Sequence, residues 1–122
     1  WLGTSRSSVA DRLQLMSHVA GHGTVLHPDD AAFILGLMRS VQAGQRWGAG
    51  QVGAAGETVA VKNGWVTDSD DGNRWIICTE GIITAGGKEL LLTALTRSNS
   101  SQGAGISRVT QSLAKARATL GV

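Results

Sequence analysis

The sequence predicts a three-layer helix–sheet–helix sandwich of the α/β (α+β) class with antiparallel strands. Two helical patterns come first, and three strand-like runs joined by short turns follow them. The last two runs are apolar on both faces, so the sheet needs a layer of helices on each side. With 122 residues, of which 42% are hydrophobic and 16% charged, the chain has the size and composition of one globular domain.

Two amphipathic helices are expected within residues 1–44. Thr4 and Ser7 are candidate N-caps for the first helix. Pro28 marks the first turn of the second helix, which Gly44 is expected to close. Apolar residues recur at helical steps in both, at Val9, Leu13, Met16 and Ala20 in the first and at Ala31, Ile34, Leu35, Met38 and Val41 in the second.

A loop rich in Gly and Ala, residues 45–57, leads to a three-stranded antiparallel meander, residues 58–97. Gly86-Gly87 suits a tight hairpin between the second and third strands. The strands are expected at 58–66, 74–85 and 88–96. In the second strand we expect Ile76, Cys78 and Ile82 on one face and Trp75, Ile77 and Ile83 on the other.

An amphipathic helix over residues 106–120 is the last expected element. Three helices are few for a sheet that is apolar on both faces, and the outer edge of the third strand has no expected partner. The chain also begins with Trp1 rather than Met. These observations predict one part of a longer polypeptide, stable only in association with the rest.

Charge and cysteine content argue against several classes of function. The net charge is +2, and the eleven Lys and Arg residues are scattered singly, so we expect no nucleic-acid partner. No apolar run approaches the ~20 residues that span a bilayer. The single Cys78 excludes an internal disulfide and a cysteine zinc cluster. His18 and His22 have the spacing of a metal pair but lack a third ligand, and we expect neither metal nor cofactor.

Lys62-Asn63-Gly64, on the first expected strand, is the most informative short segment. A lysine supplies positive charge near a reacting carbonyl, and a small polar side chain can bind a substrate carboxylate. Glycine lets a substrate lie close along the strand, and the N–H of Trp65 can complete an oxyanion hole. So short a pattern also arises by chance, and the alternative for Lys62 is an ordinary exposed lysine on an edge strand.

The segment resembles the Lys-Thr-Gly motif of serine β-lactamases and penicillin-binding proteins. The order of elements is similar to the C-terminal part of the class A β-lactamase-like fold over nearly the whole chain. Segments similar to serine hydrolases of this superfamily are GTSRSSVADRLQLM, VLHPDDAAFILGLMRSV, QRWGAG and VAVKNGWV. The resemblance implies a bacterial protein located outside the cytoplasm, either secreted, periplasmic or a lipoprotein.

The resemblance implies roles for five residues. Lys62 corresponds to the active-site lysine, Asn63 and Gly64 bind substrate, and Trp65 donates its backbone N–H to the oxyanion. Lys62 and Asn63 are then expected to line one cleft. Arg74 falls where some members place a carboxylate-binding arginine, the alternative being a solvated strand end. Asn63 stands where the motif has Thr or Ser, which alters carboxylate recognition.

Two functions follow from the resemblance. The first is a serine hydrolase that cleaves an amide, β-lactam or ester through an acyl-enzyme. Its Ser-x-x-Lys and Ser-Asp-Asn motifs are expected in the upstream half of the same polypeptide, and its substrate is a small molecule or peptide. Ser112 to Lys115 matches Ser-x-x-Lys only by coincidence of letters. The second is a non-catalytic module of the same fold, for binding or structure, such as a cell-envelope lipoprotein.

Overall fold

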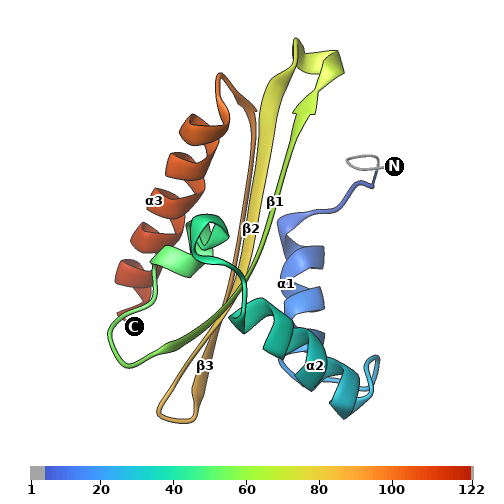
Figure 1. Ribbon diagram of the computed structural model, residues 1–122, viewed down its shortest axis with the longest axis vertical. Helices are drawn as coiled ribbons and strands as arrows, with labels where there is room; N and C mark the ends of the chain where they lie inside the picture. The colour runs from blue at the N-terminus through green and yellow to red at the C-terminus, as the bar shows by residue number, and fades with distance from the viewer. Residues whose placement is uncertain (1–4, 122) are drawn as a thin grey trace.

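The computed structural model describes residues 5–121, so Trp1 and Thr4 lie outside the described residues. It confirms an α+β arrangement with helices on both faces of an antiparallel sheet (Figure 1). Two helices cover one face, α1 (Val9–Val19) and α2 (Pro28–Arg39), and α3 (Gln102–Leu120) covers the other. Among the described residues, no helix is both long and apolar enough to cross a membrane.

The sheet consists of β1 (Thr58–Asp68), β2 (Arg74–Ala85) and β3 (Lys88–Asn99) in the order β1-β2-β3. The predicted strands are confirmed, although β1 and β3 extend two and three residues further than expected. Gly86 and Gly87 join β2 to β3 with φ angles of 56° and 76°. Two consecutive positive φ angles are what a type I′ hairpin turn requires, so this turn chemistry fixes the pairing of the two strands.

The two faces of the sheet are separate, as the alternating pattern of β2 predicts. Ile82 packs against α1 and α2, in a cluster with Met16, Val19, Met38 and Ala60. Ile77 and Ile83 face the α3 layer, in clusters that include Trp47, Ala49, Val61, Leu92, Val109 and Leu113. Two short 3-10 turns, η1 (Ala43–Gln45) and η2 (Gly48–Gln51), lie within or beside the expected loop, and Ala49 of η2 joins the α3-side core.

Helix ends differ from the sequence prediction because local caps decide them. Ser8, rather than Thr4 or Ser7, caps α1: its side chain accepts the Asp11 N–H, while Asp11 accepts the Ser8 N–H at 2.8 Å. This reciprocal capping box satisfies two helix-end donors. The last helix, expected over residues 106–120, begins earlier, at Gln102, because Ser101 Oγ accepts the Ala104 N–H at 3.1 Å and caps it there.

The second helix ends earlier than Gly44, at Arg39 with Ser40 as its C-cap. Val41 therefore does not continue the stripe of α2, and it packs instead against the α3-side cluster. The chain passes from one layer to the other in this segment. That passage carries η1 and η2 onto the face opposite to α1 and α2.

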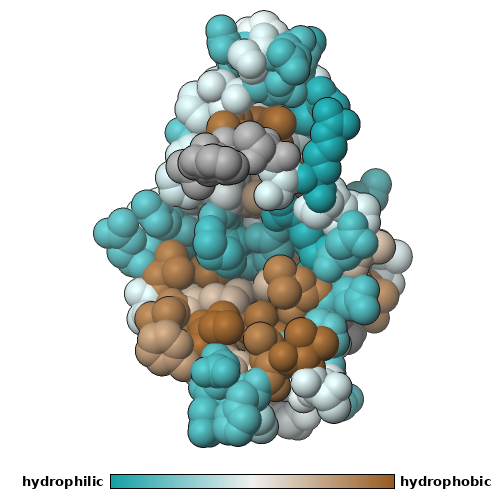
Figure 2. All heavy atoms as spheres, turned by 90° about the vertical axis from the view of Figure 1, so that its right-hand side faces the viewer, coloured by the Kyte–Doolittle hydropathy of each residue, from teal (hydrophilic) through white to brown (hydrophobic). Residues whose placement is uncertain are grey.

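The face that carries α1 and α2 leaves much apolar surface uncovered. Phe33, Leu37, Leu15 and Val25 are 68%, 55%, 54% and 71% exposed. Figure 2 shows apolar residues gathered over the lower half of this side of the molecule. Contiguous apolar surface on a soluble protein commonly marks a contact with another chain or segment.

Candidate functional site

A pocket of about 460 Å³ lies between α1 and the first two strands, on the face that carries α1 and α2. Three of its lining residues, Lys62, Asn63 and Gly64, form the motif identified in the sequence. The other walls come from the N-terminal segment and α1, and from β2. They are Ser7, Asp11, Arg12, Leu15 and Met16 on the helix side and Cys78 and Glu80 on β2.

Lys62 lies on β1, an edge strand of the sheet, directly across from Glu80 of β2. Cross-strand partners share a face, so both side chains are on the pocket side. The residue is exposed, and its Nζ donates a hydrogen bond to the main-chain carbonyl of Asn63. The structure thus places Lys62 at a concave surface, where a small molecule can reach its ammonium group.

Arg12 and Glu80 form an ion pair in the pocket, with side chains 28% and 6% exposed. Desolvation opposes the charge on Arg12, but the hydrogen bond and charge of Glu80, with Cys78 nearby, outweigh it and raise the pKa of the guanidinium. Arg12 Nε also donates to Ser7 Oγ at 2.8 Å. Arg12 is therefore committed to its neighbours, and within residues 5–121 Lys62 is the pocket cation without an ion-pair partner.

Sequence reasoning missed Arg12 and Glu80. The signal was Glu80, the single acidic residue of β2, which lies two residues from Cys78 and two from Ile82 on the face that α1 and α2 cover. A buried carboxylate needs a cation or hydrogen-bond donors. That requirement calls for a basic residue on the covering layer, and Arg12 supplies it.

Gly64 and Cys78 form part of the pocket floor. They are cross-strand partners, and a Cβ on Gly64 would lie 2.8 Å from Cys78 Sγ. Any larger residue at position 64 would displace the thiol, which explains the glycine by packing. Burial, followed by the charge of Glu80, raises the pKa of the Cys78 thiol. Cys78 therefore stays a neutral thiol, and its position is half-buried.

The side chain of Asn63 points to the opposite face, which corrects the expectation that it lies beside that of Lys62. It is 8% exposed, and its Nδ2 donates to the carbonyl oxygens of Gln45 at 2.8 Å and Trp47 at 3.1 Å. Adjacent residues of a strand alternate between faces, and here no bulge interrupts β1 at this point. Asn63 holds the η1–η2 loop against the sheet, and only Lys62 projects from the motif toward the pocket face.

Trp65, like Asn63, directs its side chain away from the pocket face. Its ring meets that of Trp47 edge-on, with centroids 6.0 Å apart and planes at 61°. The pocket lining on β1 ends at Gly64, one residue before Trp65. The role of the Trp65 N–H in an oxyanion hole stays a prediction.

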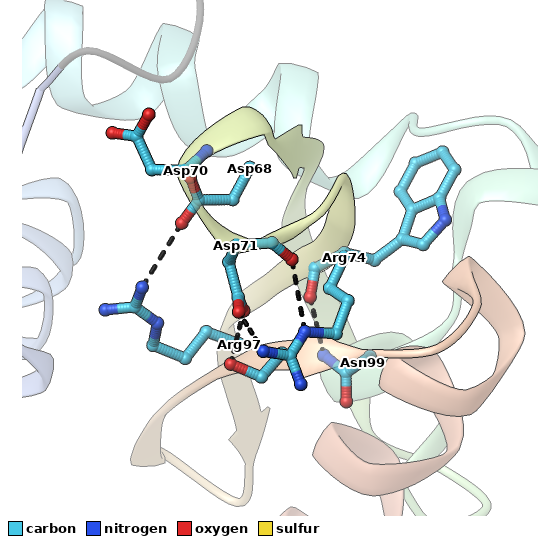
Figure 3. A network of polar contacts seen from close by, with 8 residues as sticks. Asp68, Asp70, Asp71, Arg74, Arg97 and Asn99 are labelled. Carbon is cyan, nitrogen blue, oxygen red and sulfur yellow. Dashed lines mark hydrogen bonds and ion pairs between the residues drawn. The ribbon is translucent and has the colours of Figure 1, made fainter.

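Arg74 lies at the far end of the β1–β2 hairpin (Figure 3). It forms an ion pair with Asp71, whose carboxylate also accepts from Ser98 Oγ at 2.5 Å. The bond from Ser98, and then Arg74, keep the pKa of Asp71 below its usual value. Arg74 is six positions along β2 from Glu80, the residue across the strand pair from Lys62, and six positions span roughly 20 Å along a strand. The structure therefore does not bring Arg74 to the pocket.

The remaining candidates lie elsewhere. His22 pairs with Glu89, with Nε2 and Oε2 2.6 Å apart, and residues 5–121 contain no group of three or more potential metal-binding side chains. Ser112 and Lys115 are exposed on α3, in the layer opposite to Lys62. Their match to Ser-x-x-Lys does not place them near the motif.

Comparisons with known proteins identify no relative. No family model, no curated protein and no solved structure matches the chain.

Proposed function

We propose that this chain is the C-terminal part of a β-lactamase-like serine hydrolase, and that Lys62 lies at one edge of its active site. The observation that carries the proposal is the position of Lys62. It stands on an edge strand, beside a pocket of about 460 Å³, and it has no ion-pair partner among residues 5–121. A cation placed in this way stabilises negative charge that develops on a substrate.

The nucleophile is proposed to come from the upstream half of the polypeptide. Among the described residues, one hydroxyl and one thiol line the pocket, those of Ser7 and Cys78. Ser7 Oγ accepts a hydrogen bond from Arg12, whose guanidinium cannot act as a general base. The raised pKa of Cys78 keeps its thiol protonated. Neither group is activated as a catalytic nucleophile must be, so the chain supplies an edge of the site rather than its reactive centre.

The proposed reaction is acyl transfer. A serine hydroxyl attacks the carbonyl of an amide, β-lactam or ester, the bond to the leaving group breaks, and water then hydrolyses the acyl-enzyme. Lys62 offsets the negative charge of the tetrahedral intermediate or of a substrate carboxylate. Gly64, without a side chain, leaves the strand free for close approach of the substrate. A bacterial, extracytoplasmic location belongs to the same proposal.

A second candidate is a non-catalytic module of the same fold that binds or supports another component. Two side chains expected to bind substrate, Asn63 and Arg74, are held by contacts within the protein. A chain that has kept the fold but lost the reaction would tolerate such an arrangement. This reading keeps the pocket as a binding surface.

The test is the rate of acylation in the polypeptide that includes the upstream sequence. Lys62→Ala should lower the rate of labelling by a fluorescent penicillin or a chromogenic ester by ~10²-fold or more. Lys88→Ala, which removes an exposed lysine at the β2–β3 hairpin, is the matched control and should leave the rate unchanged. Equal rates for the wild type and Lys62→Ala would remove Lys62 from the site. Wild-type protein that is folded but never acylated would favour the binding module.

A further inference from the structure

Lys62 and Glu80 carry opposite charges on adjacent strands, and the structure does not pair them. They are cross-strand partners of β1 and β2, and both line the pocket. Side chains in such a pair start about 5 Å apart, and opposite charges at this spacing usually attract each other. Yet the Glu80 carboxylate accepts a hydrogen bond from Arg12 of α1, and the Lys62 ammonium donates to the Asn63 carbonyl. Arg12 thus binds the carboxylate that stands directly across from Lys62.

Burial explains why Arg12 rather than Lys62 binds Glu80. The Glu80 side chain is 6% exposed and that of Arg12 is 28% exposed, whereas Lys62 is an exposed residue. A carboxylate that is removed from water needs a partner that also leaves water readily. The guanidinium is more weakly hydrated than an ammonium and presents its donors in a fixed plane. Arginine is therefore the better partner for Glu80, and the ammonium of Lys62 remains in water.

The second carboxylate of the pocket is also bound by a neighbour. Of the described residues that line the pocket, only Asp11 and Glu80 are acidic. Asp11 accepts from the N–H and from the hydroxyl of Ser8, at 2.8 Å each, in the capping box of α1. Both acidic side chains of the pocket are therefore held at the N-terminal end of α1, and neither forms an ion pair with Lys62.

We propose that Arg12 is a positioning residue for Lys62: by binding Glu80, it keeps the lysine ammonium available to an anionic group of the substrate. Without Arg12, the buried carboxylate would lack a cation, and Lys62 is the cation across the strand pair that can reach it. The substrate would then compete with Glu80 for Lys62. This inference rests on the proposed role of Lys62 in catalysis, but the effect of Arg12 on Lys62 can be measured without any substrate.

Acetylation of Lys62 by an activated acetate ester measures whether its amine is paired. The polypeptide that includes the upstream sequence is labelled at a fixed pH, and mass spectrometry gives the rate at Lys62 relative to that at the exposed Lys88. Only the neutral amine reacts, and a paired carboxylate keeps an amine protonated. Arg12→Gln should therefore slow acetylation of Lys62 by about fivefold. Arg12→Gln combined with Glu80→Gln should restore the wild-type rate.

The same variants connect this pairing to the proposed reaction. Arg12→Gln should lower the rate of labelling by a fluorescent penicillin by about tenfold, because Glu80 then competes for Lys62. The double variant should recover most of that rate, which it would not do if Arg12 itself bound the substrate. Arg117→Gln, which breaks the ion pair with Glu57 in the layer of α3, is the matched control and should change neither rate.

A folded Arg12→Gln protein that is acetylated at Lys62 as fast as the wild type would overturn the proposal. If Arg12→Gln does not fold, the double variant decides, because it removes both charges of the pair. Faster acetylation of Lys62 in it than in the wild type would mean that Glu80 already binds Lys62, whereas an equal rate supports the proposal. Wild-type polypeptide that penicillin does not label, with acetylation of Lys62 still slowed by Arg12→Gln, would contradict the proposed function and support the pairing.

Discussion

The two faces of the sheet differ in how completely they are packed. On the α3 side Ile77 and Val61 are 0% exposed, and the buried Thr79 accepts the Ala49 N–H at 2.9 Å. On the other side, a charged pocket and large exposed apolar residues lie beside a small core around Met16 and Ile82. The α3 face is a fully packed core. The face that carries α1 and α2 combines a cationic side chain, a pocket and exposed apolar surface. Further contacts and chemistry are expected on the second face.

The largest expected difference in the free energy of unfolding is between variants of two neighbouring isoleucines of β2, because they are the same residue type on opposite faces of the sheet. Ile77 is fully buried on the α3 side, and Ile76 is half-buried on the other. Ile77→Ala should lower the free energy of unfolding by about 4 kcal/mol, because it removes contacts and leaves a cavity. Ile76→Ala should cost about 1–2 kcal/mol. Urea unfolding followed by circular dichroism measures both, and equal losses would contradict the contrast between the faces.

Two glycines of α3 test the packing of the same face. A Cβ on Gly105 would lie 2.3 Å from Cγ1 of Ile77, whereas a Cβ on Gly103 meets nothing within 4 Å. Gly105→Ala should therefore destabilise the fold by about 2 kcal/mol through overpacking. Gly103→Ala is the matched control and should be neutral or slightly stabilising, because alanine favours a helix. A Gly105→Ala protein as stable as the wild type would show that α3 lies farther from the sheet than the structure places it.

Exposed apolar residues of α2 provide a test of the open face. Residues 1–122 alone should self-associate through Phe33, Leu37 and their neighbours. Phe33→Asp with Leu37→Asp should shift the mass measured by light scattering to that of a monomer, while stability changes by less than about 1 kcal/mol because both side chains are exposed. A wild-type chain that is already a monomer with cooperative unfolding would count against the need for an upstream half.

The smallest expected effect concerns pH and the ion pair that joins α3 to the loop before β1. Arg117 binds Glu57 through two bonds, of 2.7 and 2.6 Å. The hydrogen bond from Arg117, with that from the Ala54 N–H, lowers the pKa of Glu57 from 4.5 to about 2. A depressed carboxyl pKa adds stability above pH 4.5 that is lost as the pH falls toward 2. Glu57→Gln should flatten the pH dependence of the unfolding midpoint in this window. An unchanged dependence on pH would contradict a stabilising role for the ion pair of Arg117 and Glu57.

Much of the fold was predictable because its signals are local. The Gly86-Gly87 turn and the alternation along β2 each act over a few residues, and the structure confirms them. The stripe of α2 packs at Ile34, Leu35 and Met38, but in α1 the predicted stripe residues Val9 and Leu13 are 45% and 39% exposed.

Helix ends were predicted less well. Ser8 is followed three positions on by Asp11, whereas Ser7 is followed by Ala10, so the capping box was a sequence signal that was missed. The cap at Ser101 competes with Ser98 and Ser100 nearby.

The candidate site was predictable in part. The motif indicated Lys62, which lines the pocket. Because side chains alternate along a strand, that of Asn63 lies on the other face, and Arg74 lies at the turn end of the hairpin, away from the pocket. The distance between Lys62 and Arg74 depends on the pairing register, which the sequence does not state. Arg12 was missed because its partner, Glu80, lies 68 residues away along the chain.

Covalent labelling tests most directly whether Lys62 borders an active site whose nucleophile lies upstream. The polypeptide that includes the upstream sequence is treated with a serine-reactive fluorophosphonate, and the adduct is located by mass spectrometry after digestion. We predict one modified serine, upstream of residue 1, whose labelling slows by ~10²-fold in Lys62→Ala. An adduct on Ser7 or another serine of residues 1–122, or labelling that does not depend on Lys62, would contradict this.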